Sequence, residues 1–261
     1  AVDLRRGCAT SPLLEGAWLV VQAGGRENEQ RVIALEPASG RTLWTARGKE
    51  RTTYTSPVVA EIGGVRQLVV HHTVYGATPT SGLMGLRLSD QSVLWSTALD
   101  KLSFDTPLVL PGEGGGATVV LGSWSDLQAV RVTAAGSTFR VEPRWRTGDL
   151  SSFVSPPVFR EGHLYGFGGD FLACLDAASG RTVWKERTYP GSAILIGDRL
   201  VVLSVTAGLL RVVAATPAGY REEARLEVLN RGARAEAPPS LAAGHVLVRN
   251  DEELVAVRLG N

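Results

Sequence analysis

Long hydrophobic runs are missing from this chain of 261 residues. No stretch of about 18 apolar residues occurs, so we predict no transmembrane segment, and no signal peptide is visible. The chain also has no large excess of charge of one sign, because its 27 basic and 26 acidic residues give a formal net charge of +1. These charges are interspersed, and a chain without a basic patch has no electrostatic footprint for nucleic acid. We therefore expect no nucleic-acid partner.

What the chain does contain is a phrase that occurs three times. The copies are VIALEPASGRTLW (32–44), LMGLRLSDQSVLW (83–95) and LACLDAASGRTVW (172–184). Each has an apolar alternating run, a polar turn and a β-prone run that ends in tryptophan. Period two on both sides of a turn predicts a β-hairpin. Repetition of the phrase indicates an array of one supersecondary unit.

A second phrase precedes each hairpin, and it usually begins with Ser-Pro or Thr-Pro followed by two apolar runs around a glycine turn. Proline is tolerated at the first residue of a strand, so its recurrence marks strand starts. The two phrases together predict a meander of four antiparallel strands, A to D. The starts recur roughly every 40–50 residues, which is typical of propeller blades. We predict an all-β propeller of six blades that start near residues 11, 56, 106, 155, 192 and 238.

The stretch A-x-D-x-x-[ST]-G-x-x-x-W resembles the tryptophan-docking repeat of the pyrroloquinoline-quinone (PQQ)-like β-propellers, which are WD40-like in architecture. That family includes bacterial quinoprotein dehydrogenases and the outer-membrane-assembly lipoprotein of the BAM complex. The resemblance covers essentially the whole chain and implies a bacterial protein that is periplasmic or secreted. The structural positions that it assigns are Gly40, Trp44, Trp95, Trp145, Asp176, Gly180 and Trp184.

The repeats favour a single propeller domain over residues 1–261, which we expect to be a monomer. The last blade ends in a third strand, Leu254–Leu259, with no fourth strand behind it. Residues Val2–Arg6 can supply that strand and close the ring, which removes exposed edges. Alternatively, the chain is a fragment of a ring with seven or eight blades and lacks N-terminal blades. Both interpretations stay open here.

The two cysteines, Cys8 and Cys174, fall in blades 1 and 4 on opposite sides of a six-blade ring. A disulfide needs Cα atoms within about 7 Å, so we expect no bond between them.

Quinoprotein dehydrogenases, as the resemblance implies, hold their quinone against an adjacent cysteine pair and use a calcium site. Neither can be placed on this sequence, and the run Asn250–Glu253 is interpreted as a solvated turn. His71 and His72 are neighbours on a strand and point to opposite faces. We predict no cofactor and no metal.

One face of the propeller carries the unusual residues. In such a meander the D-to-A and B-to-C connections emerge on the same face, where binding residues concentrate. The predicted B-to-C loops are 24–30, 72–82, 123–126, 168–170 and 250–253. Aromatic residues also recur two positions before strand A, and they either pack between blades or form contacts to a partner. The predicted partner-binding residues are Arg51, Tyr54, Phe104, Asp105, Trp124 and Phe153.

Two functions follow as hypotheses. The first is a non-catalytic extracytoplasmic scaffold that binds a protein or peptide through the face with the D-to-A and B-to-C connections. The alternative is a PQQ-dependent or other redox enzyme, or a subunit of one, with a site at the mouth of the channel. Whether the chain is an enzyme stays open at this point, since a fold alone does not specify a function.

Overall fold

The computed structural model describes residues 10–24, 30–48, 51–52, 55–74, 80–101, 103, 105–151 and 155–258. Nearly all its regular structure is β-strand, and the helical exception in these residues is one 3-10 turn, η2 (Glu113–Gly115). No described helix has the length and apolar character needed to span a membrane. Six antiparallel sheets are formed by the described residues. They confirm the all-β propeller with six predicted blades.

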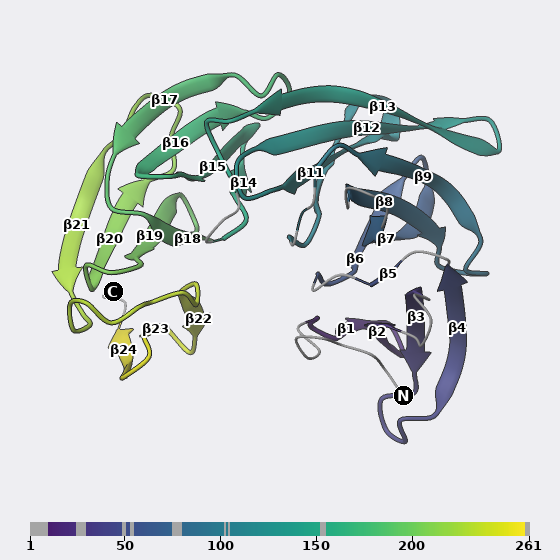
Figure 1. Cartoon of the computed structure of the whole chain (residues 1–261), viewed down its shortest axis with the longest axis horizontal. Coiled ribbons are helices and arrows are strands. Elements are labelled where there is room, and N and C mark those ends of the chain that lie inside the picture. Colours follow the sequence, from purple (N-terminus) through teal and green to yellow (C-terminus); the bar gives the residue numbers. More distant parts are fainter. Residues whose placement is uncertain are drawn as a thin grey trace. The chain divides into compact units, whose positions relative to one another are not determined.

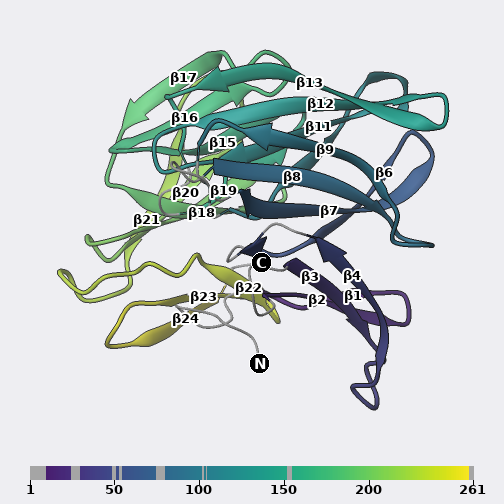
Figure 2. The ribbon, with the colours of Figure 1, turned by 45° about the vertical axis from the view of Figure 1, so that its right-hand side comes forward.

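The sheets are called blade 1 to blade 6 below, in the order in which the chain forms them. Blades 1, 2 and 3 consist of β1 (Leu13–Glu15), β2 (Trp18–Gly24), β3 (Gln30–Leu35), β4 (Thr42–Gly48), β5 (Arg51–Thr52), β6 (Val58–Ile62), β7 (Val65–Val74), β8 (Thr80–Arg87), β9 (Val93–Leu99), β10 (Leu108–Pro111), β11 (Ala117–Gly122), β12 (Leu127–Ala135) and β13 (Thr138–Thr147). The short strand β5 belongs to blade 2, where it pairs with β7. Figure 2 shows β7, β8 and β9 running side by side.

Blades 4, 5 and 6 repeat the same order. They consist of β14 (Val158–Arg160), β15 (His163–Gly168), β16 (Phe171–Asp176), β17 (Thr182–Arg187), β18 (Gly191–Ile196), β19 (Arg199–Ser204), β20 (Leu209–Ala214), β21 (Glu222–Glu227), β22 (Ser240–Ala242), β23 (His245–Arg249) and β24 (Leu254–Arg258). Blade 6 has three strands among the described residues. The strand predicted over Val2–Arg6 lies outside them.

The chain divides into two compact units. Unit 1 comprises Ala1–Ser123 and Gln128–Arg144, and unit 2 comprises Trp124–Leu127 and Trp145–Asn261. Within unit 2, the D strands β17 and β21 run along one margin of blades 4 and 5, and the A strands β14 and β18 run along the other (Figure 1). The single-domain interpretation of residues 1–261 stays a prediction.

Neighbouring blades within each unit bury apolar residues face to face. In unit 1 one core joins blades 1 and 2 through residues such as Val20 and Leu68, and a second joins blades 2 and 3. In unit 2 the corresponding cores join blades 4 and 5 and then blades 5 and 6, for example around Leu172 and Leu203. Because a lone sheet of this size leaves both faces wet, stacking of successive blades supplies the buried area that stabilises each one.

The turns between strands C and D show why the repeated phrase has its residues. In blade 4 Asp176 accepts hydrogen bonds from the backbone N–H of Ser179 (2.8 Å) and from its hydroxyl, and these bonds lower the pKa of the Asp176 carboxyl. Gly180 then adopts φ +71°, and Gly40 adopts φ +70° at the same place in blade 1. Only glycine takes this left-handed conformation without a steric cost.

Blade 2 makes the same turn without glycine. Gln91 has φ +60°, and its N–H donates to the carbonyl of Arg87 (2.8 Å), as that of Gly180 does to Asp176. We expect Gln91→Gly to raise the free energy of unfolding by about 0.5 kcal/mol, because relief of left-handed strain exceeds the added entropy of the unfolded chain. The reverse change, Gly40→Gln, is expected to lower it by about 1 kcal/mol, because a β-carbon at Gly40 meets left-handed strain. Urea unfolding checks both, and a lower stability of Gln91→Gly would contradict the strain.

The tryptophans of strands β13 and β17 reach into the next blade. Trp145 Nε1 donates to the carbonyl of Ala177 (3.0 Å), and its ring lies against Gly180. Trp184 Nε1 donates in the same way to the carbonyl of Thr216 (2.8 Å) in blade 5. Each ring therefore bridges the last strand of one blade and the C-to-D turn of the following one.

The first two tryptophans of the repeat differ. Trp95 is buried, and its Nε1 donates to Gln67 Oε1 (2.7 Å) within its own blade. Trp44 packs edge to face on Trp18, with ring centroids 5.7 Å apart. In both cases the ring still contributes to the apolar core between two blades of unit 1. Equivalent sequence positions thus hold a tryptophan in different local environments.

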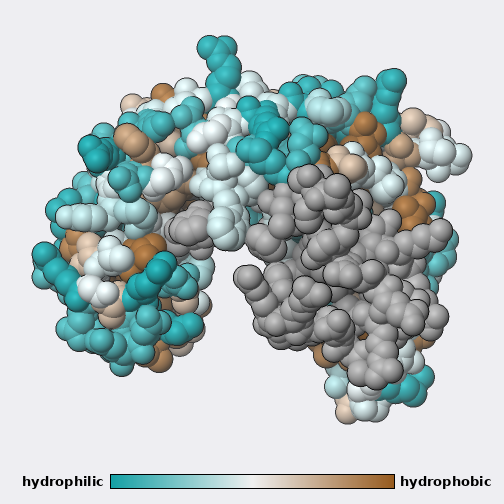
Figure 3. Space-filling view, in the orientation of Figure 1, coloured by the Kyte–Doolittle hydropathy of each residue, from teal (hydrophilic) through white to brown (hydrophobic). Residues whose placement is uncertain are grey.

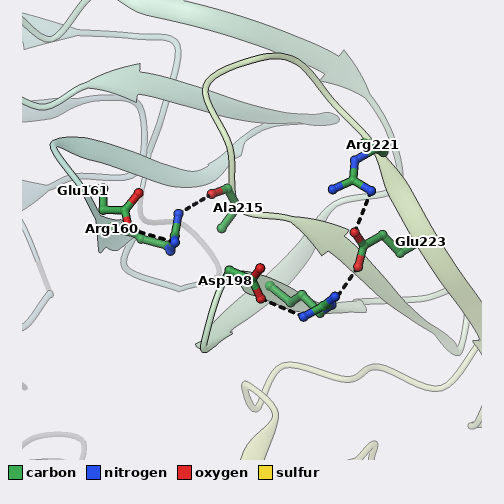
Figure 4. A network of polar contacts seen from close by, with 7 residues as sticks. Arg160, Glu161, Asp198, Ala215, Arg221 and Glu223 are labelled. Carbon is green, nitrogen blue, oxygen red and sulfur yellow. Dashed lines mark hydrogen bonds and ion pairs between the residues drawn. The ribbon is translucent and has the colours of Figure 1, made fainter.

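Charged side chains lie along the edge of blades 4 and 5 that carries the A-to-B and C-to-D turns, and one of them joins the two blades (Figure 4). Arg160 donates to the carbonyl of Ala215 (3.0 Å) and pairs with Glu161. Glu223 pairs with Arg221 (2.8 Å) and with Arg199 (2.7 Å). These ion pairs are largely exposed, and each contributes little to stability. The opposite edge of the same two blades is built differently.

Candidate functional site

A cavity of about 570 Å³ lies in unit 2 and is called the Trp124 cavity below. Its lining residues come from the edge of the blades that carries the B-to-C and D-to-A connections. They are Trp124, Ser151, Phe167, Gly169, Pro190, Val205, Thr206, Arg234 and Glu236. This is the edge on which the sequence predicted the binding face, and a volume of this size suits one or two side chains of a ligand.

Backbone hydrogen bonds fix the wall of the Trp124 cavity. The N–H of Ser151 donates to the carbonyl of Phe167 (2.9 Å), and that of Val205 donates to Pro190 (2.9 Å). Ala235, between the two charged lining residues, donates to the carbonyl of Val205 (2.7 Å). Each D-to-A connection is thereby tied to the B-to-C end of a sheet. A lining held by main-chain bonds is preorganised and needs little ordering when a ligand binds.

Trp124 is the exposed aromatic of this wall. Its side chain is 64% exposed, although the tryptophans of strands β9, β13 and β17 are buried or half-buried. The connection that carries it is anchored by Asp126, which is buried and accepts a hydrogen bond from Arg146 Nε (2.6 Å). Because the backbone of this connection is anchored, the indole offers a large amphipathic surface to a ligand, and binding costs little conformational entropy.

The rim of the Trp124 cavity carries one ion pair. Arg234 Nη2 lies 2.7 Å from Glu236 Oε1, and both side chains are exposed. Phe167, Pro190 and Val205 supply the apolar part of the wall. The cavity therefore combines an apolar interior with a charged, solvated rim.

A second cavity of about 460 Å³ lies between blades 4 and 5 and is called the Arg211 cavity. Pro190 lines both cavities. The other residues around it are Asp170, Glu186, Arg187, Thr188, Tyr189, Leu209, Arg211, Tyr220, Glu222 and Arg225. Arg225 Nε donates to Glu222 (2.7 Å), and this bond is the main reason that the pKa of the Glu222 carboxyl is lowered. Burial, followed by the hydrogen bond to Glu222, raises the pKa of Tyr220 to about 12.

Comparison with known proteins gives the family. Residues 1–186 match the family described as outer membrane protein assembly factor BamB. This chain belongs to the BamB family. The crystal structure of BamB from Moraxella catarrhalis superimposes with a TM-score of 0.63 at 13% identity, covering 98% of this chain and 70% of that one. At this identity the likeness shows the fold. No curated protein matches the chain at comparable stringency.

In this BamB-family chain, one of the predicted partner-binding residues lines a described cavity, namely Trp124. Asp105 lies in unit 1, in the connection before β10, and so belongs to a different unit. Arg51 is in β5, opposite Thr73 of β7. Tyr54, Phe104 and Phe153 lie outside the described residues. The role of these six residues in binding stays a prediction.

Other lining residues were missed. Thr206 belongs to the B-to-C turn of blade 5, and Arg234 and Glu236 belong to the connection into blade 6. The strands that flank both segments were predicted, and the meander rule alone places such connections on the binding face. The B-to-C loop predicted over 72–82 is too long, because His72 and Gly82 are paired residues of β7 and β8.

The side chains with redox or metal-binding chemistry are placed as follows. Cys174 is a free, fully buried thiol in blade 4, and burial raises its pKa to about 11, which disfavours the reactive thiolate. Cys8 lies outside the described residues. Within the described ranges, no group of three or more His, Cys, Asp or Glu side chains could hold a metal ion.

Asn250, interpreted as part of a solvated turn, is buried, and its Oδ1 accepts from the N–H groups of Glu252 and Glu253.

Proposed function

We propose that this BamB-family chain is a non-catalytic extracytoplasmic scaffold that binds a protein or peptide partner at the Trp124 cavity. The observation that carries the proposal is an indole that is 64% exposed beside a cavity of about 570 Å³. Exposed tryptophans next to pockets are typical of interface hot spots. The remaining lining then surrounds the anchor and excludes water from it.

The hydropathy of the surface supports recognition by a pocket. On the face drawn in Figure 3, hydrophobic residues lie singly or in small groups among hydrophilic ones wherever the surface is coloured. Stable binding to such a surface requires a concave anchor point, because scattered apolar residues are normal on soluble proteins. The Trp124 cavity supplies one.

The family supports the class of partner and the location. Its description is that of an outer membrane protein assembly factor. We therefore propose that the partner is a protein engaged in outer-membrane protein assembly and that this chain acts in the periplasm. The fold supports this role, since connections from several blades within unit 2 line one cavity.

Trp124→Ala tests the anchor. We expect it to weaken partner binding at least about 30-fold, because hot-spot tryptophans contribute about 2 kcal/mol or more. The Tm should change by less than about 2 °C, since the side chain is mostly exposed. Titration of the purified partner by calorimetry, together with thermal unfolding, checks both. Unchanged affinity would remove Trp124 from the site.

The partner itself can be identified by a photo-crosslinking amino acid placed at position 124 in the full-length protein in cells. A matched control is position 241, because Leu241 is 50% exposed and also belongs to unit 2, but lies in β22 beside the A-to-B turn at the opposite edge of its blade. We expect a discrete adduct with an envelope protein from position 124 and none from position 241. Equal labelling from both positions, or adducts with cytoplasmic proteins alone, would refute the proposed function.

A further inference from the structure

Arg211 carries a positive charge that is almost completely removed from water. Its exposed fraction is 3%, although it lines the Arg211 cavity. Its Nη2 donates long hydrogen bonds to Thr188 Oγ1 (3.3 Å) and to the carbonyl of Tyr189 (3.4 Å). The Nε–H has no hydrogen-bond partner among the described residues. Both acceptors are neutral, so no carboxylate is bonded directly to the guanidinium, although its charge is a minor cause of the lowered pKa of the Glu222 carboxyl in the same cavity.

The repeat shows that an apolar residue is usual at this position. Arg211 directly precedes Val212, where the register between strands C and D shifts. The residue at the same place is Ala173 in blade 4 and Met84 in blade 2. Both are buried. The fold therefore does not need a charge here, and the arginine costs stability unless something outside the chain uses it.

Two of the three carboxylates around the cavity pair with other arginines. Glu222 binds Arg225 and accepts from the Tyr220 hydroxyl (2.7 Å). Asp170 lies 3.9 Å from Arg187. Among the described residues, no carboxylate comes within ion-pair distance of Arg211. The Nε and Nη groups of an arginine form a planar fork that fits one carboxylate with two parallel bonds.

We propose that the Arg211 cavity binds the side-chain carboxylate of a Glu or Asp residue from an extended segment of the partner. This inference rests on the proposed function, because the same segment would place an apolar side chain beside Trp124. The shared residue Pro190 makes the two cavities neighbours. Tyr189, which is 55% exposed, adds an aromatic surface at the edge of the second cavity.

The test uses small probes, so that it needs no partner protein. N-acetyl-glutamate α-amide is titrated up to about 20 mM against the full chain, and the Nε–Hε signal of Arg211 is followed by NMR. Absence of that signal from Arg211→Met assigns it. We expect a saturable shift with glutamate, no shift with N-acetyl-glutamine α-amide, and a loss of affinity of at least about tenfold in Arg211→Met. Arg140→Met, at an exposed arginine of β13, is the control and should bind normally.

The same variants separate a binding role from a structural one. Methionine occupies the equivalent position in blade 2, so Arg211→Met should fold, and we expect its Tm to rise by about 2–8 °C. A fall in Tm, or an equal shift with the glutamine probe, would overturn the proposal. Preference for N-acetylglycine, which mimics a chain terminus, would also overturn it. None of these outcomes affects the Trp124→Ala test, so the two proposals fail separately.

Discussion

Gly180→Ala is expected to lower the free energy of unfolding by about 3 kcal/mol, whereas Gly40→Ala is expected to lower it by about 1 kcal/mol. Both glycines end the same turn, with φ +71° and +70°. An added methyl group costs left-handed strain at both positions. At Gly40 it would meet no atom within 4 Å, but at Gly180 it would lie 2.5 Å from Trp145 Cδ2.

The difference of about 2 kcal/mol measures how strongly the packing of the Trp145 ring depends on the absence of a side chain at Gly180. To admit the methyl group the ring must move, which overpacks the turn and breaks its 3.0 Å hydrogen bond to the Ala177 carbonyl. Urea unfolding of the two variants, with thermal unfolding as a second measure, gives the comparison. Equal destabilisation by the two substitutions would show that the ring does not depend on Gly180.

Acidification from pH 6.5 to pH 4 is expected to remove about 3 kcal/mol of stability through His71. The side chain is fully buried in β7, and burial together with the charge of the neighbouring His72 lowers its pKa to about 3. The unfolded chain binds a proton below about pH 6.5, but the folded chain keeps His71 neutral. Stability is therefore complete above pH 6.5 and falls by about 1.4 kcal/mol per pH unit below it.

His71→Gln is the matched variant, because Gln22 occupies the equivalent position in blade 1. Both residues face a strand C residue two positions before the register shift, His71 opposite Leu83 and Gln22 opposite Val32. We expect this variant to lose about 3 kcal/mol less than the native protein over the same pH range. Parallel pH profiles for native protein and His71→Gln would contradict the prediction.

The strands were predictable because their signals are local. Alternation of apolar residues, the prolines before strands A and the glycine turns each act within a few residues, so six meanders could be read in order. The full extent of β7 and β8 could not be predicted from such local signals. His72 and Gly82 continue the ladder because the absence of a side chain at Gly82 leaves room for the imidazole ring of His72. Such a cross-strand fit depends on the pairing itself.

The sequence predicted which face carries the candidate site but not most of the residues that form it. The meander rule placed the B-to-C and D-to-A connections together, and Trp124 was recognised as an aromatic on one of them. Sequence reasoning did not show that Pro190, Thr206 and Arg234 meet it around one cavity. It also did not distinguish Arg211 from a surface arginine, since its burial beside the cavity between blades 4 and 5 depends on how the two blades pack.

By itself, the sequence determined the unit of structure, its number of copies and the edge on which connections gather, because backbone turns and two-residue periodicity are short-range effects. Tertiary structure decided the environments of individual side chains. Trp95 turns to Gln67 and Trp145 to the next blade, and Arg211 is buried where other blades have apolar residues. These environments differ at equivalent positions because the residues that pack against each side chain come from distant parts of the chain. Since protein interiors are close-packed, those neighbours determine the contacts that each side chain makes.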